Sequence, residues 1–329
     1  MSTDKDIDKF VKIIKDNNLF LILSHLFPDG DSLGSQTALH CLLERLGKQS
    51  YIICQDDIPY QYRFLPGLDE VKNNFEDLML EQEPVTICLD CAEEKRMGID
   101  FKALKQKSRT IINIDHHINN SHYGDINLID SQKSATAQIL FEIMDKFFDG
   151  YMNRDIALGI YTGILTDTGR FQYENTTAQV HRIVSSLLEQ GIVPAEIFSN
   201  IYENDPFNRI KLLERVFKRI RFVPDKQVIY SFTLQEDFQQ LGLPFSAQDG
   251  IIEILRGIED VKIAALIKQV DNHHYKISLR TSRKDLNVAN LAARFGGGGH
   301  QMAAAYSREG DIERIAKDLL DSVDSYGKN

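Results

Sequence analysis

The fold is decided by residues 19–47, which read LFLILSHLFPDGDSLGSQTALHCLLERLG. The first five residues are all apolar, a pattern typical of a strand that is covered on both faces. A loop follows over residues 24–30. Residues 31–46 then place leucines at helical spacing before Gly47, a typical helix C-cap. A buried strand, a loop and an amphipathic helix in this order predict an α/β fold with a parallel sheet.

The same alternation continues along the chain. Three more short apolar runs predict strands at Tyr51–Cys54, Val85–Leu89 and Thr110–Ile114. Helical patterns follow at Ala135–Phe148, Ile156–Leu165 and Thr177–Gln190. We therefore predict that residues 1–192 form one α/β domain with a doubly wound, mostly parallel sheet, whose ligands bind at the carboxyl ends of the strands.

The remaining residues differ in character. Residues 193–222 contain Pro194, Pro206 and the basic, amphipathic segment Arg209–Arg221, so we expect a connector with one helix. Residues 223–329 again alternate strand and helix patterns and are predicted to form a second, smaller α/β domain, with a cleft between the two domains. Its predicted strands are 228–233, 262–270, 275–281 and 302–306, and its predicted helices are 250–258, 288–295 and 312–323.

Composition restricts the function. The chain has 329 residues and a net charge of −10, and its first 222 residues carry 25 Lys and Arg against 33 Asp and Glu. A protein that grips long nucleic acid through its phosphates needs a basic track, which this sequence lacks. Its apolar runs are much shorter than the roughly 20 residues of a membrane-spanning helix, and its acidic N-terminus does not resemble a secretory signal. We therefore expect a cytoplasmic protein whose four cysteines are reduced.

Acidic and histidine side chains gather just after the predicted strands. They are His25, Asp29 and Asp31 after the first strand, Asp90 after the third, Asp115-His116-His117 after the fourth, and Asp167 near the end of a later helix. Each alone has an ordinary explanation, such as a turn or a helix cap. Together at one sheet edge, the carboxylates would repel one another and raise each other's pKa, a cost that two divalent ions remove. Carboxylate and imidazole ligands without thiolate favour Mn²⁺ or Mg²⁺ over structural zinc.

These four segments resemble, in order, the four motifs of the DHH phosphoesterase superfamily, which is named after its Asp-His-His triplet. Members of the family bind a pair of metal ions, typically Mn²⁺. The resemblance implies two sets of ligands that share one bridging residue. The first ion would be held by His25, Asp29 and Asp90, and the second by Asp31, Asp90, His116 and Asp167.

Two-metal chemistry then implies the reaction. Paired ions about 4 Å apart lower the pKa of a bridging water, and the resulting hydroxide would attack phosphorus in line. Both ions and His117, which the resemblance places at the substrate phosphate, would stabilise the charge that develops on the transferred group. Asp115 would orient an imidazole. Protonated His117 could also donate to the leaving oxygen, a role that a water molecule could fill instead.

The C-terminal domain carries Arg280 on a predicted strand, followed by the run Phe295-Gly-Gly-Gly-Gly-His300. Alone, these features would be a surface charge and a flexible helix exit, although four glycines also let backbone N–H groups approach an anion closely. Their order resembles DHHA1, a domain that accompanies DHH in one branch of the superfamily and binds nucleotide phosphate or base. The resemblance implies substrate contacts from Arg280, Gly298, Gly299 and His300 across the cleft from the metals.

Within this branch, the compact chain resembles the NrnA group. That group degrades oligoribonucleotides of a few residues to mononucleotides and removes the 3′-phosphate of 3′-phosphoadenosine 5′-phosphate (pAp). A phosphodiesterase for the linear dinucleotide pApA, made during cyclic di-AMP turnover, would carry nearly the same motifs and stays the alternative. A protein of another class, a nucleotide-binding regulator with an inert metal site, is a further possibility. Such a regulator would not need the bridging carboxylate, whereas this sequence has Asp90.

Two other members of the superfamily fit less well. RecJ-like exonucleases add a strand-gripping domain for which this chain has no room. Family II inorganic pyrophosphatases carry a different second domain, without the glycine-rich run. Relatives are often homodimers, an analogy that leaves the oligomeric state of this chain open.

Overall fold

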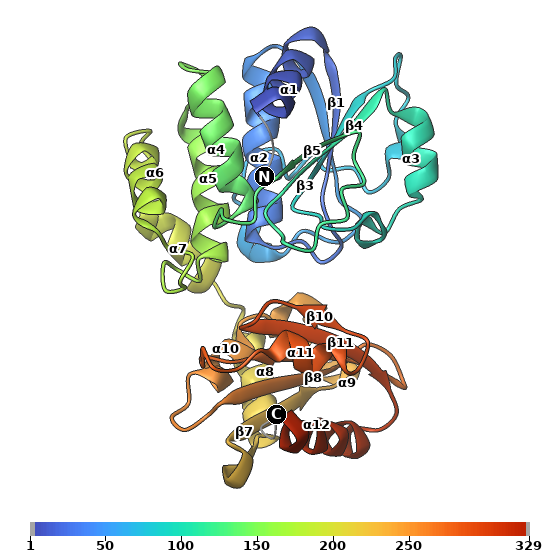
Figure 1. Cartoon of the computed structure of the whole chain (residues 1–329), viewed down its shortest axis with the longest axis vertical. Helices are drawn as coiled ribbons and strands as arrows, with labels where there is room; N and C mark the ends of the chain where they lie inside the picture. Colours follow the sequence, from blue (N-terminus) through green and yellow to red (C-terminus); the bar gives the residue numbers. More distant parts are fainter. Residues whose placement is uncertain (1–3, 327–329) are drawn as a thin grey trace. The chain divides into compact units, whose positions relative to one another are not determined.

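A computed structural model describes residues 4–326, and the chain divides into two compact units (Figure 1). The first unit extends to Asn204 and the second begins at Asp205, inside residues 193–222, where we expected a connector. This segment contains two helices rather than the one expected, namely α7 (Pro194–Tyr202) in the first unit and α8 (Phe207–Lys218) in the second. The additional helix begins at Pro194, because proline is well accommodated in the first turn of a helix.

The first unit contains a five-stranded sheet in which neighbouring strands are parallel, in the order β2-β1-β3-β4-β5. Its strands are β1 (Leu19–Leu23), β2 (Gln49–Ile53), β3 (Val85–Leu89), β4 (Thr110–Asp115) and β5 (Ile126–Ile129). The four strands predicted from apolar runs are confirmed, and every residue of β1 and β3 is buried. The sequence does not predict β5, because this edge strand is short and only half of its residues are buried.

Helices cover both faces of this sheet (Figure 1). The helices of the first unit other than α7 are α1 (Asp4–Asp16), α2 (Gly30–Arg45), α3 (Phe101–Lys107), α4 (Thr136–Phe147), α5 (Arg154–Asp167) and α6 (Ala178–Leu188). The main core lies between one face and α1, α2, α4 and α5, whereas α3 packs on the opposite face. The predicted helices correspond to α2, α4, α5 and α6 and are confirmed. We did not predict α1, although Phe10, Val11 and Ile14 recur at helical spacing, or α3, which has only seven residues and few apolar positions.

Two of these helices, α2 and α5, pack closely because both carry glycine at the contact. A Cβ atom on Gly34 would lie 2.4 Å from the carbonyl oxygen of Gly159, and one on Gly159 would lie 2.5 Å from that of Gly34. A side chain at either position would force the helices apart. The contact continues to the first residue of α2, where a Cβ atom on Gly30 would lie 2.4 Å from the Thr166 side chain. The first turn of α2 therefore lies beside the last turn of α5.

The strand order of the first sheet reverses between β1 and β3. β1 is followed by β2 on one side, whereas β3 on the other side leads to β4 and β5. Doubly wound sheets bind ligands outside the carboxyl ends of the strands at such a topological switch point. The sequence places residues 24–30 directly after β1 and Asp90 directly after β3, so both segments lie at this position.

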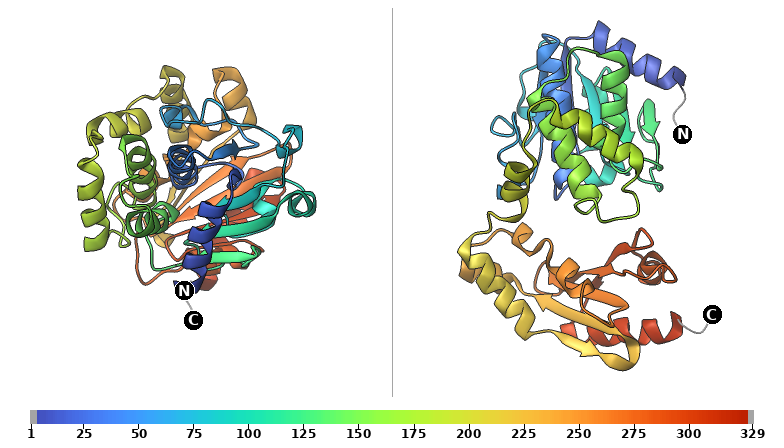
Figure 2. Two further views of the ribbon diagram at one scale, coloured as in Figure 1. Left: turned by 90° about the horizontal axis from the view of Figure 1, so that it is seen from above. Right: turned by 90° about the vertical axis from the view of Figure 1, so that its left-hand side faces the viewer.

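The second unit has a six-stranded sheet in the order β10-β11-β9-β8-β7-β6, where β7 and β8 are parallel and the other described neighbours are antiparallel. Its strands are β6 (Arg221–Val223), β7 (Val228–Thr233), β8 (Ile263–Gln269), β9 (His274–Arg280), β10 (Gly298–Gly299) and β11 (Ala303–Glu309). Helices α8, α9 (Gln235–Leu241) and α10 (Ile251–Arg256) pack into one core. Helices α11 (Val288–Ala293) and α12 (Ile312–Tyr326) pack into a second core, and Figure 2 shows both units from two further directions.

The smaller α/β domain predicted from the sequence is confirmed, with all four of its predicted strands and all three predicted helices present. The sequence does not predict α9, β6 or β10, which are all short. Short 3₁₀ helices lie at Tyr60–Tyr62, Phe75–Asp77, Glu94–Met97, Pro224–Lys226 and Phe245–Gln248. None of the helices described within residues 4–326 combines the length and apolarity that a bilayer span requires. All four cysteines are free and buried, as predicted for reduced thiols.

Candidate metal centre

The loop after β1 places two carboxylates at the start of α2. Asp29 caps the helix, since its Oδ1 accepts a hydrogen bond from the Ser32 N–H at 3.0 Å and its own N–H donates to the Ser32 hydroxyl at 2.9 Å. The other oxygen of Asp29 lies 3.8 Å from His25 Nε2. Asp31 lies in the first turn of α2 and is fully buried. Asp29 is thus both a helix cap and a neighbour of His25.

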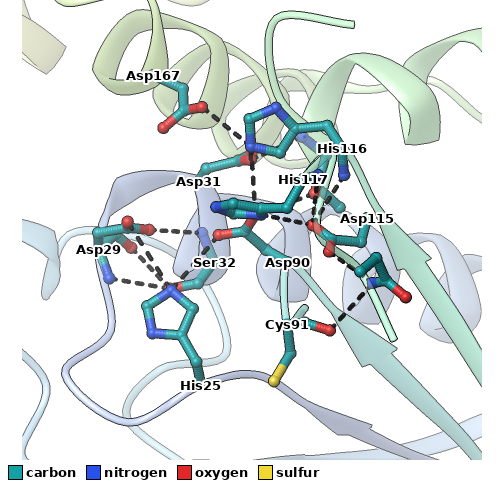
Figure 3. A network of polar contacts seen from close by, with 12 residues as sticks. His25, Asp29, Asp31, Ser32, Asp90, Cys91, Asp115, His116, His117 and Asp167 are labelled. Atoms are coloured by element: carbon teal, nitrogen blue, oxygen red, sulfur yellow. Dashed lines mark hydrogen bonds and ion pairs between the residues drawn. The ribbon is translucent and has the colours of Figure 1, made fainter. Parts of the chain in front are cut away.

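Asp90 lies at the centre of the cluster of polar side chains (Figure 3). Its φ of 54° is a left-handed conformation that costs a non-glycine residue roughly 1–3 kcal/mol and is typical of functional sites. The Asp90 N–H still donates to the carbonyl oxygen of Ile114 at 3.0 Å, so β3 and β4 remain joined at this point. The two carboxylate oxygens of Asp90 lie 3.5 Å from His25 Nε2 and 3.5 Å from His116 Nε2.

The six predicted ligands fall into two of the three groups of possible ligand atoms that the described residues form in this cluster. In each group, one nitrogen or oxygen atom per residue lies within 4.8 Å of the others. The first group consists of His25, Asp29 and Asp90, and the second of Asp31, His116 and Asp167. His116 Nε2 lies 3.1 Å from Asp167 and 3.9 Å from Asp31, and its contact with Asp90 joins the second group to the first. The structure therefore brings together all six residues that the sequence suggested as metal ligands.

Asp115 and His117 form a pair beside these groups. Asp115 ends β4, is fully buried, and places its Oδ1 2.7 Å from His117 Nδ1. Its Oδ2 accepts a hydrogen bond from the side-chain amide of Asn120 at 2.7 Å, and the same amide donates to Asn113 at 2.7 Å. Asp115 therefore has the contacts of a group that orients His117, although its oxygen also lies within reach of a metal bound by Asp90 and His116.

The carboxylates differ in their tendency to ionise. Burial and the charge of Asp90 raise the pKa of Asp31 well above its ordinary value. Burial also raises the pKa of Asp167, with the charges of Asp31 and Asp90 acting in the same direction. Burial opposes the ionisation of Asp90 too, but the hydrogen bond with His25 and the charges of the nearby histidines outweigh it and lower the pKa of this carboxyl. Of Asp31, Asp90 and Asp167, Asp90 is thus the one whose ionisation its surroundings favour.

The histidines are perturbed in opposite directions. Burial lowers the pKa of His116, which favours the neutral imidazole that a metal requires. Burial also disfavours the charged form of His117, but its hydrogen bond with Asp115 and the charge of Asp90 outweigh this effect and raise its pKa to about 9. His117 therefore carries a proton at neutral pH in the metal-free chain.

The donor set fits divalent cations. Among residues 4–326, no Lys or Arg forms an ion pair with Asp31, Asp90 or Asp167, so histidines are their only ion-pair partners. Carboxylate oxygens and imidazoles are the ligands that hard and borderline divalent ions prefer. Cys91 follows Asp90 directly, but its thiol donates to the Glu93 carbonyl and burial raises its pKa to about 12, which disfavours the thiolate. These observations indicate a divalent-metal site without sulfur ligands.

Comparison with known proteins identifies the two units. The model of the DHH family, N-terminal domain, matches residues 19–164, and the model of the DHHA1 domain matches residues 225–328. A Thermus thermophilus protein named bifunctional oligoribonuclease and PAP phosphatase NrnA is 31% identical, over 92% of this chain and 88% of its own length. The chain belongs to the DHH family.

Other DHH relatives agree. A Bacillus subtilis protein of the same name is 26% identical, over 94% of this chain and 96% of its own. A solved structure, described as an exopolyphosphatase-related protein from Bacteroides fragilis, superposes with a TM-score of 0.89 at 26% identity, covering 98% of this chain and 97% of that one. The resemblance seen in the motifs is confirmed, and the chain is an NrnA-like member of the family with a DHH unit and a DHHA1 unit.

The DHHA1 unit brings its predicted substrate contacts to one end of its sheet. Arg280 is the register partner of Ala303, and Ala303 exchanges backbone hydrogen bonds with His300 at 2.7 and 3.2 Å. Gly298 and Gly299 form the exposed edge strand β10. Arg280 is half-buried and its Nε donates to Glu253 at 3.0 Å, so it is not the isolated surface charge considered from the sequence.

Sequence reasoning missed residues that hold the predicted ligands in place. Thr136 donates its hydroxyl to Asp90 at 3.1 Å, and its N–H donates to Asp31 at 2.7 Å. Asn120 donates its side-chain amide to Oδ2 of Asp115, the oxygen that does not contact His117. The only available signal for Thr136 is that it is the second residue of the predicted helix Ala135–Phe148, and no sequence signal pointed to Asn120. The contacts of Thr136 join segments far apart in the sequence, whereas Asn120 lies only five residues after Asp115.

Proposed function

We propose that this chain is a two-metal phosphoesterase that hydrolyses very short oligoribonucleotides to mononucleotides and removes the 3′-phosphate of pAp. The observation that supports it most directly is the pair of ligand groups that meet at Asp90. The Thermus thermophilus and Bacillus subtilis relatives carry names with these two activities and match nearly the whole chain. The proposal combines the chemistry of the cluster with the substrates of those relatives.

In this proposal, each ligand group holds one divalent ion, with Mn²⁺ as the preferred metal and Mg²⁺ as a substitute. The first ion is held by His25, Asp29 and Asp90, and the second by Asp31, Asp90, His116 and Asp167. When bound, the ions supply positive charge at the phosphate and make water a stronger nucleophile at neutral pH. Asp29 and Asp167 are the most exposed of these ligands, with side chains 53% and 30% accessible, so substrate reaches the centre from their side.

The chain's own groups would complete the reaction. The hydrogen bond between His117 Nδ1 and Asp115 favours a protonated imidazole, which would offer positive charge to the phosphoryl oxygens. It could also donate a proton to the leaving oxygen, a role that a water molecule could fill instead. Asp115 is held in turn by Asn120, which fixes the direction of the imidazole. In the DHHA1 unit, Arg280 would bind phosphate through its planar guanidinium, and Gly298, Gly299 and His300 would supply further contacts to the nucleotide.

The alternative is a phosphodiesterase for pApA, since the same centre would cleave that linear dinucleotide. A nucleotide-binding regulator is disfavoured, because no metal ligand of the cluster is missing and the regulator has no need for the costly backbone of Asp90. The analogy with dimeric relatives suggests a homodimer, which light scattering of the purified chain would test.

The deciding experiment compares pAp, pApA and a short RNA side by side, with Mn²⁺, with Mg²⁺ and with EDTA. We expect mononucleotide and phosphate release with Mn²⁺, none with EDTA, and none from the Asp167→Ala variant. Hydrolysis of pApA alone would replace the main proposal by the alternative. Nucleotide binding without any turnover in Mn²⁺ would favour the regulator.

A further inference from the structure

The first turn of α4 contacts two of the acidic residues at once. The Thr136 and Ala137 N–H groups donate to the two oxygens of the Asp31 carboxylate, at 2.7 and 2.9 Å. The Thr136 hydroxyl donates to Asp90 Oδ1 at 3.1 Å. The N-terminus of α4 therefore contacts both Asp31 in α2 and Asp90 after β3.

Asp31 satisfies donors that a helix cannot satisfy internally. The first N–H groups of an α-helix lack intrahelical acceptors, and residue 135, at the N-cap of α4, is an alanine that cannot cap with its side chain. The Asp31 carboxylate takes that place from another helix and also accepts from the Ser35 hydroxyl at 3.2 Å. Its negative charge at the positive end of α4 is favourable. These contacts leave Asp31 with a single orientation.

The approach of α4 to Asp31 requires a glycine on α5. A Cβ atom on Gly163 would lie 2.7 Å from Asp31 Oδ1 and 2.6 Å from the Ala137 side chain. The absence of a side chain at this position lets α2, α4 and α5 meet around one carboxylate. Since Thr136, Ala137 and Asp31 are all buried, water cannot replace the lost contacts if they move apart.

We propose that Thr136 is a positioning residue of the metal centre, because its hydroxyl and the first N–H groups of α4 hold Asp90 and Asp31 at a fixed separation. This inference rests on the proposed metal site, in which Asp31 and Asp90 share one ion. Partners that orient metal ligands change metal affinity by about 10- to 100-fold when they are removed. Thr136 contributes here without being a ligand itself.

The test is calorimetric titration of the full chain with Mn²⁺ in the absence of nucleotide. Thr136→Val keeps the shape and the backbone N–H but removes the hydroxyl, so we expect Mn²⁺ affinity to fall by about 10- to 100-fold. Thr136→Ser keeps the hydroxyl, and we expect an affinity close to that of the unmodified chain. Saturating Mn²⁺ should restore most of the turnover of Thr136→Val.

Thr162→Val is the matched control. Thr162 is also fully buried, and its hydroxyl has no hydrogen-bond partner among the described residues. We expect its Mn²⁺ affinity to be unchanged. The metal-free unfolding midpoint is measured for every variant. If Thr136→Val lowers this midpoint by more than about 10 °C, Thr136→Ala is titrated instead under the same criterion.

Three results would overturn the inference: unchanged Mn²⁺ affinity in Thr136→Val, an equal loss in Thr136→Ser, or an equal loss in Thr162→Val. Each of them leaves the proposed function intact as long as the unmodified chain binds Mn²⁺ and cleaves its substrates. Failure of the unmodified chain to bind Mn²⁺ would instead refute the metal site, and with it the role of Thr136.

Discussion

Each unit contains buried carboxylates, and the two units treat them differently. In the second unit, Asp237 is fully buried but accepts hydrogen bonds from Arg219 and Arg215, at 2.9 and 3.2 Å, and from the Leu234 N–H at 2.9 Å. In the first unit, Asp31, Asp90 and Asp167 lie together with no Lys or Arg paired to any of them among residues 4–326.

This difference in ion-pair partners distinguishes Asp237, which stabilises the fold, from the acidic residues of the first unit, for which we propose metal ions as partners. Burial of a carboxylate opposes its charge. Arginine ion pairs outweigh burial at Asp237, and histidines outweigh it at Asp90, so the pKa of both carboxyls is lowered. For Asp31 and Asp167 the opposite shift of the pKa remains, because neighbouring carboxylates add to the effect of burial. The same residue type is therefore paired with arginines in one unit and, in our proposal, binds metal in the other.

The largest effect is expected from Asp90→Asn. This change removes the charge that both proposed ions share, so turnover should fall by about 10³-fold or more, equivalent to about 4 kcal/mol of activation free energy. The metal-free chain should also lose some unfolding free energy, because the histidines around Asp90 favour its charged form. Steady-state kinetics at saturating Mn²⁺ and urea unfolding in EDTA check both parts. Activity within tenfold of the unmodified chain would remove Asp90 from the centre.

Asp237→Asn is expected to lower the stability of the second unit and to leave activity unchanged. Breaking a buried ion pair typically costs about 3 kcal/mol, because it leaves charges without a partner, so the second unit should unfold at lower urea. The kcat measured where the chain is still folded should remain unchanged. A loss of kcat with unchanged stability would contradict the division between the two units.

The loss of stability in Asp237→Asn should depend on pH. Since the folded-state pKa of Asp237 lies below its ordinary value of 3.8, its stabilisation is complete above that value and is lost as the pH falls through the folded pKa. The stability difference between the unmodified chain and Asp237→Asn should therefore be constant near neutral pH and shrink in acid. Urea titrations at several pH values measure it, and a difference that grows in acid would have the wrong sign.

A smaller effect is expected from metal addition. Mn²⁺ at 100 times its dissociation constant should stabilise the chain by about 2.7 kcal/mol, because it binds the folded state alone. The gain should appear in the unfolding of the first unit and vanish in Asp90→Asn, whereas Asp237→Asn should keep it. An equal gain in Asp90→Asn would show that Mn²⁺ binds elsewhere.

The smallest effect is expected from Arg280→Ala, in the unit without the metal centre. If Arg280 binds substrate alike in the ground and transition states, KM should rise about tenfold while kcat changes little. Arg294→Ala, on the exposed end of α11, is the control and should leave KM unaltered. An unchanged KM in Arg280→Ala would limit Arg280 to its ion pair with Glu253.

Much of the fold follows from local sequence patterns. Buried parallel strands are continuous apolar runs, so β1, β3 and β4 are visible from Leu19–Leu23, Val85–Leu89 and Thr110–Ile114. The edge strand β5 and the short helix α3 are not visible in the same way, because a half-exposed element needs few apolar residues. Partly buried elements are therefore the ones that are hardest to predict from sequence patterns.

The sequence by itself determined which side chains could bind metal and in what order they follow the strands, since ligand chemistry and strand ends are local properties. Only the tertiary structure decided how these side chains are held. The contact of Thr136 with Asp31 joins residues 105 positions apart, and it depends on Gly163 from a third helix. Hydrogen bonds and close packing between distant segments leave no periodic signal in the chain, so they are determined only when the helices pack.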